Sequence, residues 1–210
     1  MTLFTVNMRV ADWPCLVVGA GAIALPKAKR LIEAGAAVTI IAPNAPDELL
    51  GATMVKREAT LDDLEGVRLA IFGTDDKELN RHLYHEAVSR GILAAAVDDL
   101  ENADFYMPAI LRRGDLEVAV SSAGKGPAYS VWVRNRLAEM LDDAYGEALA
   151  WFAWLRRTHL RHWVMRDRTR AFNALLSRDF MPYFREGRVD AWTTEAEAIL
   201  QAVKPDALDP

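Results

Sequence analysis

The chain has 210 residues, a formal net charge of −5 and a hydrophobic fraction of 51%. This is enough chain for one large domain or two small ones with a proper core, and the acidic balance argues against nonspecific nucleic-acid binding. No apolar run approaches the roughly 20 residues that span a bilayer, no signal peptide is recognisable, and the single cysteine, Cys15, excludes an intrachain disulfide, so we expect a cytoplasmic protein without membrane contact.

A glycine-rich turn follows the first short apolar run. Residues 15–18 have the length of a buried strand, and residues 19–24 form a G-x-G-x-x-A turn that leads into a helix. Gly19 permits the tight turn, Gly21 lets a pyrophosphate approach the backbone, and Ala24 lets the helix pack closely on the strand. The N–H groups at the helix start favour an anion. The pattern predicts a dinucleotide-binding turn, against the alternative of a tight turn that binds no ligand.

The second strand of this unit ends without the residue that distinguishes the two nicotinamide cofactors. The helix is expected to end at Gly35, and residues 38–42 form the second apolar run. Pro43 and Asn44 follow it, with neither an Asp or Glu for a ribose hydroxyl nor an Arg for a 2′-phosphate. Asn44 is either a ribose contact or only a turn residue. NAD and NADP are therefore not distinguished at this position.

Strands and helices continue to alternate up to residue 99. The pattern predicts an edge strand at 3–10, further strands at 53–56, 67–72 and 92–97, and a helix at 77–90. Asp75 or Asp76 is expected to cap that helix. Such alternation is typical of an α/β fold with a Rossmann-type doubly wound parallel sheet, which binds ligands at the carboxyl ends of its strands. This rule places on one rim residues 19–24, 43–44, 73–76 and 98–99.

The pattern changes after residue 99. Residues 105–111 and 116–121 are expected to form a hairpin, and a polar glycine-rich loop follows at 121–127. The remainder is helical, with helices expected at 127–166, interrupted near 145–146, at 168–177 and at 194–203. Five of the six tryptophans lie in this half. They indicate either an ordinary small helical core or a subunit interface, since both are rich in aromatic residues.

Three groups of residues have side chains suited to chemistry at the rim. Asp98 or Asp99 would serve as a general base near a bound nicotinamide, although an Asp-Asp pair is also a common turn or cap. The loop from Ser121 to Gly126 either offers hydroxyl and N–H groups to a carboxylate or a phosphate, or is a flexible surface loop. The third group is basic and comprises Arg112, Arg113, Lys125, Arg134 and Arg136. These side chains either bind a polyanionic substrate or lie on solvent-exposed faces.

The histidine pairs His82/His85 and His159/His162 have a spacing that two metal ligands can use. No cysteine or third histidine accompanies either pair, so we expect surface histidines and predict no metal site.

Three motifs occur in an order and spacing that resemble one known family. They are VVGAGAIALPKAKRLIEAGAAVTIIAP, FGTDDKELN and AAAVDDLENADFYMPAILRRGDLEVAVSSAGKGPA. Over about residues 3–140 the chain resembles precorrin-2 dehydrogenase, which is also the N-terminal half of siroheme synthase and doubles as sirohydrochlorin ferrochelatase in bifunctional members. The helical remainder is similar in plan.

The resemblance implies NAD-dependent oxidation of precorrin-2 to sirohydrochlorin in siroheme or cobalamin biosynthesis, and leaves open the insertion of Fe(II) or Co(II). It also implies a homodimer joined through the hairpin and the following helix. The expected regions are a Rossmann domain at 1–103, a dimerisation region at 104–146 and a helical region at 147–210.

The resemblance also assigns residues. The family's essential aspartate falls on Asp98. Its NAD contacts fall on Gly21, Ala22, Ile23, Pro43 and Asn44, beside Gly19 of the turn, with Thr74 and Asp75 next along the rim. A polycarboxylate macrocycle suits a basic rim and a serine-glycine loop, so tetrapyrrole contacts are expected at Arg112, Arg113, Ser121, Ser122, Gly124 and Lys125.

The chain departs from the family's usual residues at Pro26, Gly73 and Gly126, and these changes leave the substrate and chelation open. A non-catalytic NAD-sensing or tetrapyrrole-carrier module is the alternative. Asp98 and the basic rim favour the enzyme, because a sensor needs no base.

Overall fold

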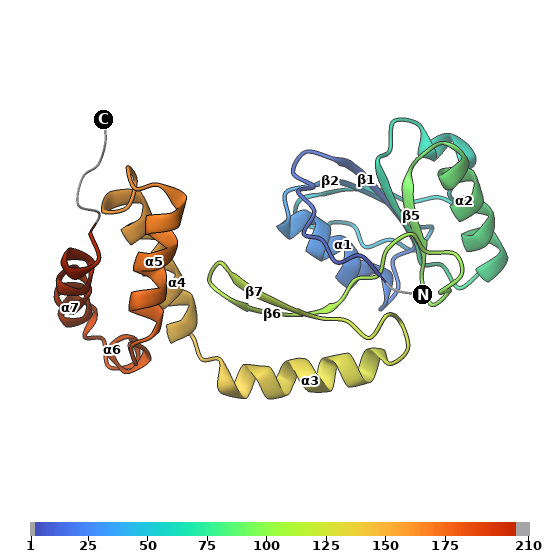
Figure 1. Cartoon of the computed structure of the whole chain (residues 1–210). Helices are drawn as coiled ribbons and strands as arrows, with labels where there is room; N and C mark the ends of the chain where they lie inside the picture. Colours follow the sequence, from blue (N-terminus) through green and yellow to red (C-terminus); the bar gives the residue numbers. More distant parts are fainter. Residues whose placement is uncertain (1–2, 205–210) are drawn as a thin grey trace. The chain divides into compact units, whose positions relative to one another are not determined.

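The computed structural model describes residues 3–204 and contains two compact units (Figure 1). The first comprises the chain up to Met107 together with Ala123–Lys125, and the second comprises Pro108–Ser122 together with the chain from Gly126 onward. The hairpin and the helical remainder thus share one unit, and their division into a dimerisation region and a helical region stays a prediction. Within residues 3–204, no helix is both long and apolar enough to span a bilayer.

The first unit is built on a parallel sheet of five strands in the order β3-β2-β1-β4-β5. The strands are β1 (Pro14–Val18), β2 (Ala37–Ile41), β3 (Ala52–Val55), β4 (Leu69–Phe72) and β5 (Leu93–Ala96). The connecting segments hold α1 (Ala24–Glu33), the short 3-10 helix η1 (Leu61–Leu64) and α2 (Lys77–Ser89). The predicted Rossmann-type α/β sheet is confirmed.

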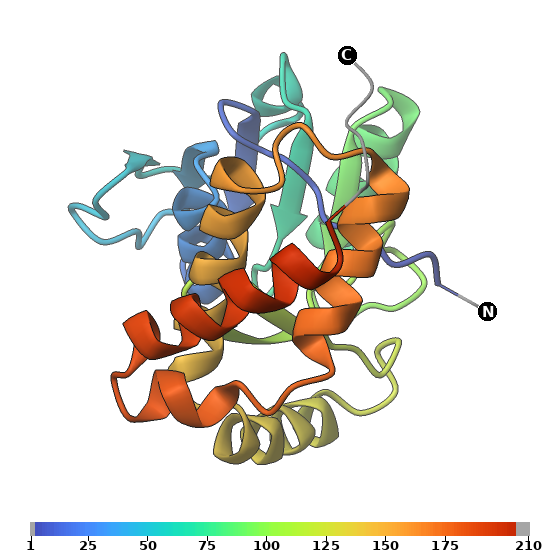
Figure 2. The same cartoon turned by 60° about the vertical axis from the view of Figure 1, so that its left-hand side comes forward.

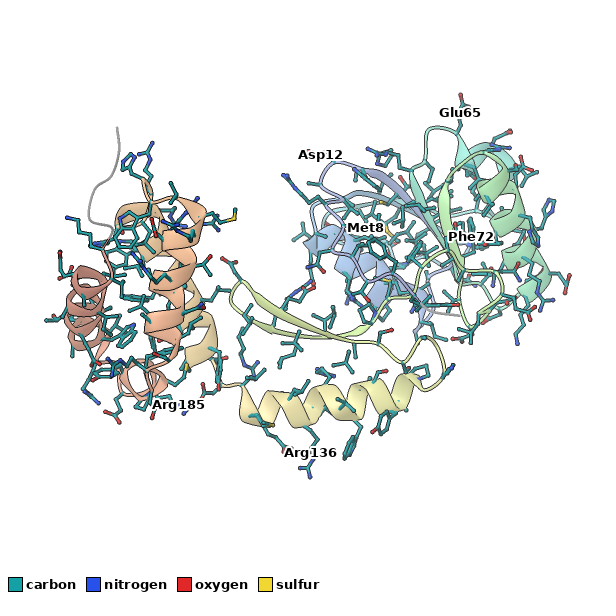
Figure 3. All side chains as sticks on the ribbon, viewed as in Figure 1. Met8, Asp12, Glu65, Phe72, Arg136 and Arg185 are labelled. Carbon is teal, nitrogen blue, oxygen red and sulfur yellow. The ribbon has the colours of Figure 1, made fainter. Side chains whose placement is uncertain are left out.

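Helices cover both faces of this sheet, which explains its unbroken apolar strands. In β1, Cys15 and Val17 pack in the cluster that includes α1, whereas Leu16 and Val18 pack in the cluster that includes α2. Phe72 of β4 is fully buried on the α2 side, and Figure 3 shows it among the packed side chains of the first unit. Strands buried on both faces carry near-continuous hydrophobic runs, as these do.

The predicted edge strand at 3–10 is wrong. These residues form no regular structure, and the alternating apolar side chains of Phe4, Val6 and Met8 are exposed. A segment outside the prediction covers one edge of the sheet instead. The N–H of Ala96 donates to the carbonyl of Asn102 (2.8 Å), and that of Asp104 donates to the carbonyl of Ala94 (2.9 Å). Residues 102–104 therefore occupy the open side of β5.

The second unit begins with the predicted antiparallel hairpin, β6 (Ala109–Arg113) and β7 (Leu116–Val120), on which α3 (Pro127–Met140) packs. Four further helices follow, namely α4 (Ala144–Thr158), α5 (Met165–Leu176), α6 (Met181–Arg185) and α7 (Val189–Ala202). Figure 2 shows α7 in red across α4 and α5 in orange. The expected interruption near 145–146 lies instead between α3 and α4, the last helix begins five residues before Thr194, and α6 was not predicted.

Aromatic side chains fill the core of these helices. Trp192 is fully buried and contacts Trp151 (5.6 Å between ring centroids) and Phe180 (5.6 Å). Trp163 is also buried, while Trp132 on α3 is 56% exposed. The interpretation as a small helical core therefore holds for three of the tryptophans, and the subunit interface stays a prediction for α3.

The hairpin tip is fixed against α4 through backbone atoms. A side chain on Gly146 of α4 would place its Cβ 2.5 Å from the carbonyl oxygen of Arg113, which is closer than real Cβ atoms approach. Gly114, in the hairpin turn with φ +55°, faces the same glycine. The Arg113 side chain donates to the carbonyls of Leu141 (2.7 Å) and Ala138 (3.2 Å), at the end of α3. Hairpin, α3 and α4 are thus joined at one point.

Candidate cofactor and active site

The loops that follow β1, β4 and β5 each begin with a backbone hydrogen bond to the end of a neighbouring strand. The N–H of Gly19 donates to Ile41 (2.9 Å), that of Gly73 to Val18 (2.8 Å) and that of Val97 to Phe72 (2.8 Å). Each loop therefore starts in register with the neighbouring strand. Three of the loops on the predicted rim are thus fixed to the sheet at their first residues.

Gly73 is the point where these three loops meet. Gly19 has φ +104°, and a Cβ on it would lie 2.7 Å from the carbonyl carbon of Gly73. A Cβ on Gly73 would lie 3.1 Å from both the Cβ of Ala24 and the Cγ2 of Val97. Ala24 opens α1 and Val97 precedes Asp98, so the glycine turn and the loop after β5 are neighbours across Gly73. The unusual glycine at 73 thus has a packing role.

The N-terminus of α1 is open to an anion. Its N-cap residue, Ile23, provides no side-chain hydrogen bond, the first turn contains no acidic residue, and a Cβ on Gly21 would meet nothing within 4 Å. The neighbouring helix α2 differs, because the Asp76 carboxylate accepts from the N–H groups of Glu78 and Leu79 (3.0 Å each). Free N–H groups and the helix dipole favour negative charge, so these residues fit a pyrophosphate.

A buried asparagine fixes Thr74 on the rim. Asn80, 3% exposed, accepts from the Thr74 hydroxyl (2.7 Å) and N–H (3.2 Å), and its amide donates to the Thr74 carbonyl (2.9 Å). Asp75 beside it is exposed. The sequence analysis missed Asn80. The signal was its spacing, because Asn80 lies three and seven residues before Leu83 and Ala87 on the buried face of α2.

Pro43 and Asn44 lie in a turn just after β2, closed by the N–H of Ala45 donating to Ala42 (3.1 Å). Both side chains are exposed at the same edge of the sheet as the glycine turn. Their position agrees with either a ribose contact or a plain turn.

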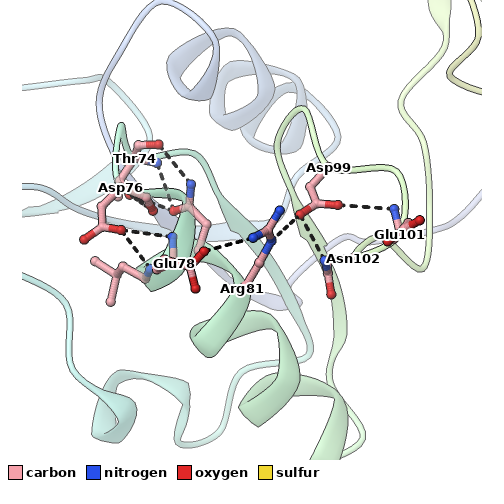
Figure 4. A network of polar contacts seen from close by, with 9 residues as sticks. Thr74, Asp76, Glu78, Arg81, Asp99, Glu101 and Asn102 are labelled. Carbon is pink, nitrogen blue, oxygen red and sulfur yellow. Dashed lines mark hydrogen bonds and ion pairs between the residues drawn. The ribbon is translucent and has the colours of Figure 1, made fainter.

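The two adjacent aspartates have different surroundings, and Figure 4 shows the contacts of Asp99. Asp99 accepts from Arg81 Nε (2.9 Å), Asn102 Nδ2 (2.9 Å) and the N–H of Glu101 (3.3 Å). The hydrogen bond from Arg81 is the main reason why the pKa of the Asp99 carboxyl lies below its usual value. Asp99 therefore organises its own loop, as the turn-residue alternative proposed.

Asp98 carries the carboxylate that is not engaged. It is exposed, its backbone has φ +60°, and within residues 3–204 it makes no hydrogen bond or ion pair. Asp tolerates this left-handed conformation better than most residues, yet such backbone strain concentrates at functional sites. The loop thus presents one carboxylate to solvent while it uses the other to hold its shape.

Lys27 links Asp98 to the start of α1. Burial lowers the pKa of the Lys27 ammonium, and the negative charge of Asp98 partly offsets this effect. Lys27 lies one turn into α1. Asp98 is therefore within electrostatic range of Lys27, near the start of α1.

The serine-glycine loop approaches the same region through its glycine. A Cβ on Gly124, which has φ +77°, would lie 3.1 Å from Leu100 Cδ1, so the loop packs on the segment that follows Asp98 and Asp99. Lys125 beside it is exposed. The Ser122 hydroxyl accepts from the N–H of Gly126 (3.1 Å) at the start of α3. Ser121 is exposed.

The predicted basic group is mostly engaged within the second unit. Arg112 Nε donates to Glu117 (2.8 Å), and Arg113 binds the end of α3. Arg136 pairs with Glu139 (2.9 Å) and points away from the hairpin (Figure 3). A structural role accounts for Arg113. Contact of these arginines with a substrate stays a prediction.

Potential metal ligands are dispersed in the part of the chain that the structure describes. There, no three or more His, Cys, Asp or Glu side chains gather closely enough to hold a metal ion.

The comparisons with known proteins agree on one family. Residues 6–109 match the family described as putative NAD(P)-binding, and residues 113–140 match the sirohaem biosynthesis protein central family. A siroheme synthase of Chromobacterium violaceum is 37% identical over 155 residues, which are 70% of this chain and 32% of that protein. One of Thioalkalivibrio sulfidiphilus is 33% identical over 210 residues, covering 96% of this chain and 42% of the relative.

A solved structure of SirC, a precorrin-2 dehydrogenase, shares the fold with a TM-score of 0.75 and 22% identity, covering 96% of this chain and 99% of that one. The chain spans about a third to two fifths of the length of the siroheme synthases that it matches. Two consecutive family models and these relatives confirm the resemblance seen in the motifs. The chain belongs to the siroheme synthase family, of which it carries the putative NAD(P)-binding region and the sirohaem central region.

Proposed function

We propose that the protein oxidises precorrin-2 to sirohydrochlorin with NAD as the hydride acceptor. The observation that carries this proposal is the combination, at one sheet edge, of an uncapped helix N-terminus and the unengaged carboxylate of Asp98. A sensor or carrier module requires the first feature and has no use for the second. The names of the related siroheme synthases and of the structurally similar dehydrogenase support the same reaction.

The cofactor is held at its pyrophosphate. Gly19 and Gly21 leave room for it, and the N–H groups of Ala22 and Ile23 face it at the start of α1. Pro43 and Asn44 would contact the adenosine ribose, and Thr74 and Asp75 would contact the cofactor further along the rim. Bound NAD⁺ supplies an acceptor for the hydride that leaves precorrin-2.

Asp98 takes the proton that the oxidation releases. Precorrin-2 loses one hydride and one proton, so the balanced products are sirohydrochlorin, NADH and a proton. The carboxylate accepts that proton and returns it to water, to which its side chain is open. Asp99 keeps the loop in place through Arg81, so the base is presented in one orientation.

The tetrapyrrole contributes several carboxylates, and we assign their partners to the serine-glycine loop and the hairpin. Gly124 and Lys125 lie on the segment after Asp98, where a macrocycle over the base would reach them. The remaining proposed contacts are Ser121, Ser122, Arg112 and Arg113. Because Arg113 also caps α3, we expect it to contribute least.

The active form is proposed to be a homodimer formed through the hairpin and α3. Large apolar side chains on α3 remain exposed, with exposed fractions of 66% for Tyr129, 56% for Trp132 and 68% for Met140. A second copy would bury them. The single cysteine is buried, which is compatible with the cytoplasm as the compartment.

Insertion of Fe(II) or Co(II) into sirohydrochlorin is a second candidate activity at the same place. It releases two pyrrole protons, and Asp98 is a base that would accept them in turn. The product formed from precorrin-2, NAD and Fe(II) without oxygen, identified by its absorption spectrum, decides whether this step occurs.

Replacing Asp98 by Asn tests the proposal. We expect NADH formation from precorrin-2 to fall by about 10²- to 10⁴-fold, as is typical when a general base is lost, while the dissociation constant for NAD stays within about twofold. Glu101→Gln is the matched control, because Glu101 is an exposed acid on the same loop. If Asp98→Asn keeps the wild-type rate of NADH formation, Asp98 is not the general base. If the wild-type protein forms no NADH from precorrin-2, the sensor or carrier alternative is favoured.

A further inference from the structure

A groove lies between α4 and α5 of the second unit. Its volume is about 850 Å³, within the range of small-molecule sites, which is about 300–1,000 Å³. Its lining includes the four arginines Arg156, Arg157, Arg161 and Arg168, together with Phe152 and Phe172. Among the residues that the structure describes, no acidic one lines it. The groove therefore combines a strongly positive rim with an aromatic wall.

Among residues 3–204, no acidic partner neutralises the four groove arginines. Within that same range, none of these four arginines forms an ion pair, whereas most arginines elsewhere in the second unit do. Arg170 of α5, which does not line the groove, pairs with Asp167 (3.6 Å), and Arg185 pairs with Asp142 (2.7 Å). Unpaired arginines concentrated in one concavity attract anions, and their planar groups match carboxylates.

Arg168 adds a second, independent indication of a ligand. Its Nε is buried and has no hydrogen-bond partner in the described residues. A buried donor without an acceptor is costly, and most buried polar groups in native proteins are satisfied. An acceptor oxygen from a bound ligand would satisfy it. The fold tolerates the neighbouring charges because Arg156 and Arg157 lie in the last turn of α4, where the helix dipole favours cations.

We propose that this groove binds a tetrapyrrole polycarboxylate. The carboxylates would pair with the four guanidinium groups, and the flat macrocycle would lie against Phe152 and Phe172. The assignment rests on the proposed function, because that reaction supplies a ligand of this chemistry as substrate and as product. The helical region thereby gains a role of its own, which is to hold a tetrapyrrole.

The test uses uroporphyrin, a stable aromatic octacarboxylate, with the full-length protein. Binding is followed by titration calorimetry and by quenching of tryptophan emission at 0.15 M salt, where exposed charges beyond about 8 Å are screened. The double variant Arg156→Gln/Arg161→Gln removes two exposed groove arginines. Arg178→Gln is the matched control, because Arg178 is likewise exposed and without an ion pair among the described residues but lies outside the groove.

We expect the double variant to bind uroporphyrin at least tenfold more weakly, or to lose one porphyrin per chain, while Arg178→Gln changes the affinity by less than twofold. The NAD affinity should stay the same in all three proteins. Mellitate, a benzene hexacarboxylate, should bind the wild-type groove at least tenfold more weakly than uroporphyrin, because it lacks the macrocycle.

Two results would overturn the assignment. One is equal uroporphyrin affinity and stoichiometry in the groove variant and the Arg178→Gln control. The other is mellitate binding as tight as uroporphyrin, which would show that charge alone selects the ligand. Neither readout requires turnover, so the two proposals fail independently. If the protein forms NADH but the groove variant binds uroporphyrin normally, the proposed function stands and the groove assignment falls. If the groove variant loses uroporphyrin binding but the wild-type protein forms no NADH, only the groove assignment stands.

Discussion

Substitution by Ala should affect different properties at two glycines of the turn after β1. At Gly19 it should lower the stability of the first unit, and at Gly21 it should lower the affinity for NAD. Gly19→Ala adds a Cβ at a residue with φ +104°, 2.7 Å from the Gly73 carbonyl carbon. The left-handed backbone alone costs an L-residue about 1–2 kcal/mol, and the obstructing atoms are backbone that cannot rotate away. We expect a loss of roughly 3 kcal/mol in the free energy of unfolding of the first unit, or roughly 10 °C in its melting temperature.

Gly21→Ala adds the same methyl group where nothing lies within 4 Å. The stability of the first unit should therefore change by no more than about 0.5 kcal/mol. The methyl group would, however, occupy the space that the pyrophosphate needs. We expect the dissociation constant for NAD to rise at least about tenfold, which corresponds to a loss of 1.4 kcal/mol in binding free energy.

Calorimetry and far-UV circular dichroism follow the unfolding of both variants, and titration calorimetry measures NAD binding. Tryptophan emission is unsuitable, because only Trp13 of the six tryptophans lies in the first unit. The reasoning fails if Gly19→Ala melts within about 2 °C of the wild-type protein. It also fails if Gly21→Ala binds NAD as tightly as the wild type, since the open space at Gly21 would then have no ligand.

Three further predictions concern other parts of the molecule. Burial raises the pKa of the Cys15 thiol to about 11, so a thiol reagent at pH 8 should modify it only in urea, and rapid labelling of the native protein would contradict its position. The hydrogen bond from Arg57 lowers the pKa of the Asp63 carboxyl to about 2, so its stabilising contribution is complete above its unfolded value near 4 and disappears as the pH falls towards 2. Asp63→Asn should therefore flatten the dependence of the urea midpoint on pH between 5 and 2, and an unchanged slope would argue against this pair. Gly146→Ala should destabilise the second unit by about 2–3 kcal/mol, because its Cβ would meet the Arg113 carbonyl, and unchanged tryptophan-monitored unfolding would refute that contact.

Apolar periodicity predicted the parallel sheet because burial on both faces leaves a continuous signal in each strand. It failed at residues 3–10, where alternation is present but no neighbouring strand supplies hydrogen bonds. It also failed at the start of α7, whose first turn begins at Val189 without a side-chain cap. The start expected at 194 rested on a Ser/Thr-x-x-Glu capping pattern at Thr194–Glu197, which lies inside that helix. Local cap patterns do not determine where packing begins a helix.

The candidate site was partly visible in the sequence. The glycine turn and the Asp98-Asp99 pair could be placed on one rim from topology alone. Which aspartate is unengaged could not be determined from the residues, because it depends on Arg81, eighteen positions away in the chain. Asn80 was not predicted for a related reason. The sequence of a helix does not show which residue outside the helix an asparagine side chain binds, here Thr74.

The backbone contact between the hairpin turn and α4 has a consequence for any assembly of two copies. Because Gly146 and Gly114 meet without intervening side chains, no flexible group there can absorb a tilt of the hairpin relative to α4. Two chains that paired through their hairpins would thus hold their arginine grooves at a constant separation. A change in the angle between the paired hairpins would therefore rotate each groove by the same angle, as a rigid body.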